Sequence, residues 1–177
     1  MMEWNRPRSV RQIGSVPGRE RIYVEDYVMR FAKRLAAKQS DNEKAAMLLG
    51  NQYHYNGQKI VQISGIVEIP QFARRNSPVL SPQSWDSVYT EIKENFTDLD
   101  IVGWFYTARD FDRQDAGKLL EIHKANFQHR DKVLYILDEK EQEDGMFLYH
   151  MGNFERQQGY YIYYEKNPET VSYTHLT

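Results

Sequence analysis

The spacing of apolar residues near the start of the chain predicts an amphipathic helix. Between residues 24 and 35, apolar side chains fall at i, i+3, i+4, i+7 and i+11, and basic residues occupy the opposite face. The stripe consists of Val24, Tyr27, Val28, Phe31 and Leu35. We therefore expect this helix to bury one face in the core.

Two apolar runs separated by an Asn-Gly pair predict a β-hairpin. Residues 45–53 and 59–68 are rich in the aliphatic and branched side chains that are typical of buried strands. Between them, Asn56 and Gly57 tolerate the positive φ angles that a tight hairpin turn requires. We expect the two runs to pair as neighbouring antiparallel strands.

The rest of the chain mixes helices and strands. Ser84 is an expected N-cap, and Trp85, Val88, Ile92 and Phe96 form the buried face of the helix that follows it. Another helix is expected at residues 112–127, and further strands at residues 100–107, 132–137, 145–151 and 159–165.

This order of elements indicates the fold class. Clustered strands with interspersed helices favour an α/β sandwich whose sheet is mixed, mostly antiparallel and flanked by helices. A doubly wound nucleotide-binding fold is disfavoured, because the chain has neither a Gly-rich phosphate turn nor a regular alternation of strand and helix.

The composition is that of an ordinary soluble domain. The chain has 177 residues, of which 41% are hydrophobic, and its net charge of -2 gives no sign of a nucleic-acid or membrane surface. It has no cysteine, which excludes disulfides and thiolate chemistry and fits a cytoplasmic location. No apolar run approaches the roughly 20 residues that span a bilayer.

Four short motifs follow one another along the chain: EKAAMLLG at residues 43–50, IVEIP at residues 66–70, IVGW at residues 101–104 and VLYILD at residues 133–138. In this order they resemble the MPN (JAB/Mov34) domain family, and the likeness covers residues 22–165. The first strand of that family has the form Glu-x-x-Gly-x-Leu-Leu-Gly, its next strand ends near a proline, and its metal-site strand begins Ile/Val-Val-Gly-Trp. A later apolar strand of the family matches the fourth motif. The resemblance implies an MPN-like (cytidine-deaminase-like) sandwich.

Catalytic members of that family carry a JAMM motif. An upstream glutamate acts as general base on a zinc-bound water, and two histidines in His-x-His together with an aspartate hold the zinc. A serine, three residues before that aspartate, helps to stabilise the oxyanion.

Carried onto this chain, the resemblance implies a site that has lost its metal ligands. The glutamate falls on Glu43, and the two histidine positions are occupied by Tyr106 and Ala108. If four residues are deleted from the spacing, the serine and aspartate fall on Asp112 and Asp115. One carboxylate then remains of three zinc ligands, so we expect no metal, no cofactor and no catalytic residue. Strict spacing places the last pair on Ala116 and Leu119.

Other residues offer little alternative chemistry. No two histidines are spaced to chelate a metal from one helix or strand, and His123 lies among apolar residues, as a structural core histidine would. The acidic turn at residues 138–144 lacks the alternating ligands and the central glycine of a calcium loop, so we interpret it as a solvated loop.

These observations lead to a functional hypothesis. We expect residues 22–168 to form a non-catalytic MPN-like domain that binds a protein partner, which is another MPN-like chain or a second copy. The alternatives are a divergent metal-dependent isopeptidase or peptidase, and a ligand sensor that uses the vacated pocket near Trp104 and Tyr106. No nucleic-acid partner is expected.

The two ends of the chain differ in character from this domain. Residues 1–21 are polar and contain five arginines, and we expect an irregular basic arm. Residues 169–177 resemble adapter read-through and predict a non-native or disordered tail. The natural protein is then expected to continue, and a bacterial parent with a LysM module is one interpretation.

Overall fold

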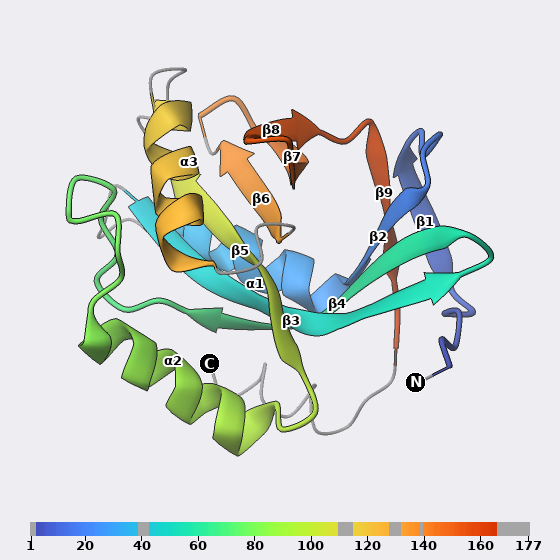
Figure 1. Cartoon of the computed structure of the whole chain (residues 1–177), viewed down its shortest axis with the longest axis horizontal. Coiled ribbons are helices and arrows are strands. Elements are labelled where there is room, and N and C mark those ends of the chain that lie inside the picture. The colour runs from blue at the N-terminus through green and yellow to red at the C-terminus, as the bar shows by residue number, and fades with distance from the viewer. Residues whose placement is uncertain (1–2, 39–42, 110–114, 128–131, 139, 166–177) are drawn as a thin grey trace.

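A single curled sheet with helices on both faces forms the fold. The computed structural model describes residues 3–38, 43–109, 115–127, 132–138 and 140–165. Within them, nine strands form one mixed sheet in the order β1-β9-β2-β4-β3-β5-β6-β7-β8, which curls into a half-barrel (Figure 1). The strands are β1 (Val10–Gly14), β2 (Glu20–Glu25), β3 (Glu43–Tyr55), β4 (Gln58–Glu68), β5 (Asp100–Ala108), β6 (Val133–Asp138), β7 (Glu143–His150), β8 (Asn153–Arg156) and β9 (Gly159–Tyr163), and the helices are α1 (Asp26–Ala37), α2 (Pro82–Asn95) and α3 (Asp115–Asn126).

The pairing of the strands confirms the predicted mixed sheet. β1 with β9, β3 with β4, β3 with β5, β6 with β7 and β7 with β8 are antiparallel. β2 is parallel to β4 and β9, and β5 is parallel to β6. The mixed α/β class is therefore confirmed, with a half-barrel in place of a flat sandwich layer.

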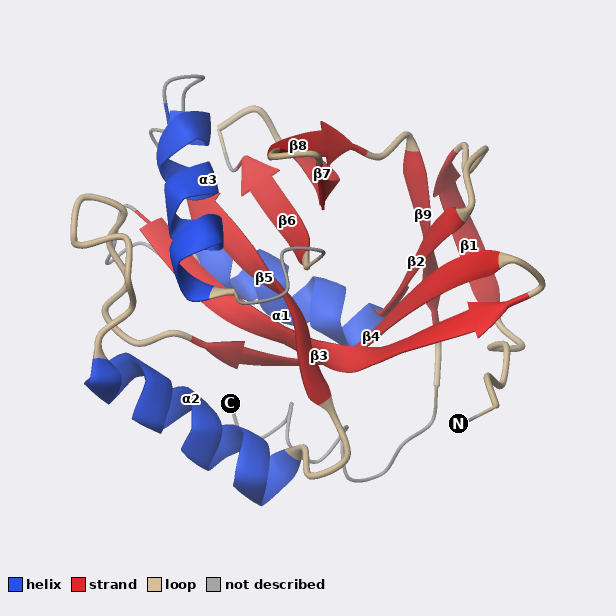
Figure 2. Cartoon of the chain, viewed as in Figure 1, coloured by secondary structure: helices blue, strands red, loops and turns tan. Residues whose placement is uncertain are grey.

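The two faces of the sheet carry separate apolar cores. The buried stripe of α1 packs with residues of β2 to β7 and β9, which confirms the predicted amphipathic helix. On the other face, α2 and α3 pack over alternate residues of β3 and β5. Figure 2 shows these helices on opposite sides of the strands. No helix in the described part of the chain is long and apolar enough to cross a bilayer.

Local signals account for most element boundaries. Asn56 and Gly57 adopt φ angles of 50° and 75°, as the hairpin turn requires. The cap of α2 is Ser81, whose side chain accepts the Ser84 N–H, so the prediction that Ser84 is the cap was wrong by one turn. Gly103 is required in β5, because a Cβ there would lie 2.2 Å from the Val133 carbonyl oxygen of β6.

The N-terminal segment is more ordered than its composition indicated. Residues 1–21 were expected to be an irregular arm, but β1 lies within them and β2 begins there. Trp4 packs in a cluster with Tyr161 and Tyr163 of β9, so the arm covers the outer face of that strand. β8 was not predicted either. The tail at residues 169–177 lies outside the described residues.

Glu25 is a buried carboxyl group at the junction of β2 and α1. Its side chain is the N-cap of α1 and accepts the backbone N–H groups of Tyr27 and Glu165, each at 3.3 Å. Burial raises the pKa of Glu25 to about 7 from an ordinary value of 4.5, and the two backbone hydrogen bonds oppose that rise. The group is therefore ionised in the folded protein only above neutral pH.

This burial predicts a pH-dependent stability. Between pH 4.5 and about 7 the folded state keeps a proton that the unfolded chain has lost, so the contribution of Glu25 to stability falls as pH rises through this window. Glu25→Gln removes this titration. We expect its free energy of unfolding, relative to wild type, to rise by about 3 kcal/mol from pH 4.5 to pH 8.

Urea denaturation followed by circular dichroism at a series of pH values measures this difference. Glu20→Gln, a change in an exposed side chain of the same strand, is the matched control. A Glu25→Gln difference that does not change with pH would contradict the prediction.

Candidate functional site

The ends of β3, β5 and α3 bring together three of the residues singled out in the sequence. Glu43 begins β3, Tyr106 lies near the end of β5 and Asp115 begins α3. The β3–β5 register pairs Glu43 with Ala108, two residues beyond Tyr106. Arg74 contacts Glu43, Tyr106 and Asp115. We call Glu43, Arg74, Tyr106 and Asp115 the Arg74 cluster.

The guanidinium group of Arg74 lies between two carboxylates. Its Nη1 donates to Glu43 Oε2 at 2.6 Å and to the Tyr106 hydroxyl at 2.7 Å, and its Nε is 3.2 Å from Asp115 Oδ1. The Arg74 backbone N–H also donates to Glu43 Oε1 at 2.5 Å, and the Tyr106 hydroxyl donates to Oε2 at 2.7 Å. The Arg74 side chain is only 19% exposed, so these are charge-assisted contacts with limited access to water.

The segment that follows β4 carries Arg74 to this position. We call residues 69–81, between β4 and α2, the strap. Because β4 runs antiparallel to β3, the chain leaving β4 passes the start of β3, and Ile69 N–H donates to the Ala45 carbonyl at 2.9 Å. Near its other end, Leu80 N–H donates to Asn126 Oδ1, and Asn126 Nδ2 donates to the Pro78 carbonyl. Hydrogen bonds therefore hold the strap at both ends.

Aromatic rings fill the space beneath Arg74. The ring of Phe72 lies 6.1 Å from that of Trp104 and 5.8 Å from that of Tyr106, and both partners are almost fully buried. Burial raises the pKa of the Tyr106 hydroxyl above its ordinary value, and the neighbouring Glu43 carboxylate raises it further. Tyr106 therefore stays neutral, and its hydroxyl donates a hydrogen bond to Glu43. Phe72 and Arg74 of the strap therefore cover part of the surface of Trp104 and Tyr106.

His123 has a structural position, as predicted. It is fully buried, and its Nδ1 accepts the Trp104 indole N–H at 3.0 Å. Rings of Phe127, Tyr149 and Phe154 surround it. This hydrogen bond occupies the Nδ1 lone pair, so Nδ1 is not available to a metal ion.

Ala108 and Asp112 are the other two residues of the predicted site. Ala108 is 2% exposed, and Asp112 lies outside the described residues. His54 is exposed near the end of the β3–β4 hairpin, far along β3 from Glu43. Among the residues that the structure describes, no group of three or more His, Asp or Glu side chains is arranged to hold a metal ion.

Sequence reasoning missed Arg74 and Phe72. Both lie in a proline-containing loop with no secondary-structure pattern, so their distance from Glu43 could not be read from local spacing. The antiparallel pairing of the hairpin could have indicated that these residues lie near Glu43. Once residues 45–53 and 59–68 are paired in antiparallel register, the residues after Glu68 must return to the start of β3. A cation within reach of that point is a natural partner for Glu43.

Comparison with known proteins identifies the fold and no function. No family model matches the chain, and no curated protein matches it. Among solved structures, the chain is similar to the solution structure of protein DSY2949 from Desulfitobacterium hafniense, a Northeast Structural Genomics Consortium target. The TM-score is 0.53 at 13% sequence identity, over 82% of this chain and 94% of the other. At this identity the likeness concerns the fold alone.

The geometry of the Arg74 cluster predicts a coupled contribution to stability. Arg74→Met removes the cation and leaves Glu43 poorly solvated. We expect a loss of about 2 to 3 kcal/mol in the free energy of unfolding. In Arg74→Met/Glu43→Gln the stranded charge is gone, so the double variant should lose clearly less than the sum of the single losses.

Urea unfolding of the four proteins in this cycle measures the coupling. Arg75→Met is the control, because Arg75 is the exposed neighbour of Arg74 and has the same charge. Strictly additive losses would show that Arg74 and Glu43 do not depend on each other.

Proposed function

We propose that this chain is a non-catalytic MPN-like domain that acts by binding a protein partner in the cytoplasm. One observation carries the proposal: a guanidinium group, and not an open site, lies between Glu43 and Asp115. In the family resemblance these residues correspond to the general base and to a metal ligand. Arg74 supplies the positive charge that a metal ion would otherwise provide to such carboxylates.

The convergence of distant positions supports the MPN-like arrangement. Glu43, Tyr106 and Asp115 belong to three separate elements, yet all three contact Arg74. The resemblance places the JAMM positions on these same residues, and it places the second histidine on Ala108, which pairs with Glu43 across β3 and β5. The half-barrel with helices on both faces is compatible with this family.

The filled site limits what its residues can do chemically. A general base must reach a water molecule or a substrate proton, but both oxygens of Glu43 accept hydrogen bonds from the strap or from Tyr106. Asp115 forms an ion pair with Arg74. These contacts favour a binding domain over the divergent hydrolase, and over a sensor that uses the space beside Tyr106.

The available surfaces also favour interaction through the helices. All residues of β9 are buried, so that strand offers no aromatic face to a partner. The polar face of α1 is exposed and carries the cations Arg30, Lys33 and Arg34, and the exposed C-cap residue Lys38 adds a fourth. We therefore infer that α1 contributes to the interaction surface.

The proposal predicts that the purified protein holds no stoichiometric zinc and cleaves no peptide or isopeptide bond. The physical reason is that Arg74 occupies the space between the carboxylates. Elemental analysis after dialysis against zinc, and an assay on an isopeptide-linked protein dimer, measure the two properties. One zinc ion per chain that is lost in Glu43→Ala or Asp115→Ala would overturn the proposal and favour the hydrolase.

The resemblance itself can be tested by rebuilding the ligand set. Tyr106→His and Ala108→His, combined with Arg74→Ala, would restore two imidazoles beside Asp115 and remove the competing cation. We expect this triple variant to bind zinc in isothermal titration calorimetry, and Tyr106→His/Arg74→Ala, with one histidine, to bind far more weakly. No zinc binding by a folded triple variant, or binding that Asp115→Ala does not weaken, would show that these positions are not arranged as in the MPN family.

A further inference from the structure

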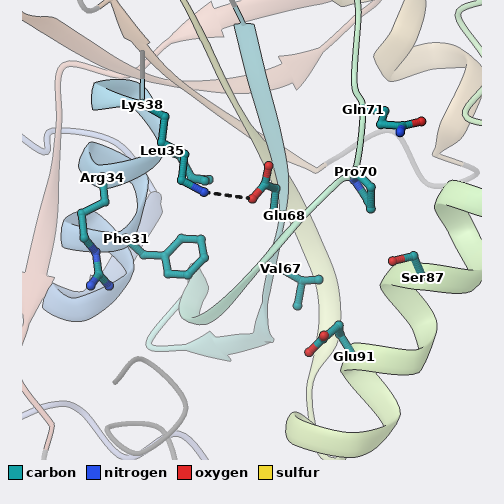
Figure 3. A pocket seen from close by; sticks show the side chains of 10 residues that line it. All are labelled: Phe31, Arg34, Leu35, Lys38, Val67, Glu68, Pro70, Gln71, Ser87 and Glu91. Carbon is teal, nitrogen blue, oxygen red and sulfur yellow. Dashed lines mark ion pairs between the residues drawn. The ribbon is translucent and has the colours of Figure 1, made fainter. Parts of the chain in front are cut away.

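A groove lies between α1 and α2 at the end of β4. It has a volume of about 610 Å³, which is within the range of binding pockets. Figure 3 shows α1 on one side, α2 on the other and the last residues of β4 between them. The groove is separate from the Arg74 cluster, since no member of that cluster lines it.

The groove follows a strand edge that has lost its neighbour. β2 pairs with β4 only as far as Ile63, because the chain then turns into α1. The Ile69 N–H donates to β3, so by the alternation of an antiparallel ladder the backbone groups of Glu68 point away from β3, toward this edge. The Tyr27 hydroxyl donates to the Ser64 carbonyl, but among the described residues the end of β4 has no strand partner on this side. Such an edge fits an extended peptide segment rather than a globular surface.

The walls of the groove differ in chemistry. Phe31 and Leu35 of α1, with Val67 of β4, form an apolar floor. Arg34 in the last turn of α1 and the C-cap residue Lys38 stand on the α1 side. On the facing wall, α2 presents Ser87 and Glu91.

The cations of the α1 wall are incompletely neutralised. Arg34 lies over the Phe31 ring, at 5.7 Å, and among the described residues it forms no ion pair. Lys38 is 3.7 Å from Glu68, which is closer to Lys44 at 3.3 Å. On the other wall, Glu91 accepts a hydrogen bond from Asn95. Glu68 also lines the groove and already lies near Lys38, so Arg34 is the cation that a ligand carboxylate would pair with.

We propose that this groove binds an extended segment of a partner protein in which apolar and acidic side chains alternate. Alternation fits because successive side chains of an extended chain point to opposite sides. Apolar side chains lie on Phe31 and Val67, and carboxylates lie beside Arg34 and Lys38. This assignment rests on the proposed interaction function and adds the surface and the chemistry of the partner.

Binding of a fluorescein-labelled peptide of alternating valine and glutamate, measured by anisotropy, tests the proposal. We expect Arg34→Glu/Lys38→Glu to weaken binding by about tenfold or more. Arg8→Glu/Arg19→Glu makes the same change in net charge at exposed positions away from the groove and should have little effect. A peptide with lysine in place of glutamate should bind wild type weakly.

A second variant tests the groove without changing its charge. Ser87→Trp places a large ring in the groove from α2, and we expect it to weaken binding of the acidic peptide while circular dichroism shows an unchanged fold. In amide chemical-shift mapping of wild type, the peptide should perturb α1, the end of β4 and α2.

The outcomes separate this proposal from the proposed function. The groove proposal would be overturned by any of three results: chemical-shift perturbations on another surface, equal weakening of binding by both double variants, or no binding of the peptide. Tighter binding of a single-stranded RNA of equal length would also overturn it. Zinc-dependent peptide cleavage would overturn the non-catalytic function and leave the groove result standing.

Discussion

Charge compensation around Glu43 is the interaction on which this part of the molecule depends. A carboxylate that is largely removed from water needs a cation or several hydrogen bonds, or it destabilises the fold. Glu43 obtains both from Arg74, through the backbone N–H and the guanidinium group. Because Arg74 belongs to the strap, the same contacts also fix the path of the chain from β4 to α2. The electrostatics of Glu43 therefore help to position the strap, together with its hydrogen bonds to Ala45 and Asn126.

The register between β3 and β5 sets the place where that compensation occurs. Glu43 lies opposite Ala108, a small residue that leaves space, and Tyr106 projects from the same face toward the strap. Gly103 permits the close approach of β5 to β6 farther along the strand. A shift of one residue would turn Tyr106 to the α1 face and separate it from Glu43.

Local patterns in the sequence predicted the elements that bury a regular face. The α1 stripe and the Asn56-Gly57 hairpin were readable because helix periodicity and turn chemistry act over a few residues. β1 and β8 were missed because most of their side chains are exposed, so neither has an apolar pattern. β1 exists through its pairing with β9, which is distant in sequence.

The candidate site was predictable only in part, for the same reason. The family resemblance selected Glu43, Tyr106 and Asp115, and these residues do meet. It contained no information on the side chains that pack against these three residues. Arg74 and Phe72 do so, and they come from a loop whose path depends on the hairpin register and on two anchoring contacts to Asn126. Such contacts are long-range, and no local pattern encodes them.

The strap links the closed site to the open groove. Pro70 and Gln71 border the groove, and Phe72 and Arg74, a few residues later, close the space over Tyr106. The Arg74 cluster thus holds one border of the groove in place, and a preformed border would lower the entropy cost of the binding proposed for this groove. A mobile strap would neither cover Tyr106 nor form a fixed border of the groove. In this fold the contacts that fix the strap over Tyr106 also fix one border of the groove, so the Arg74 cluster and the groove depend on the same segment of chain.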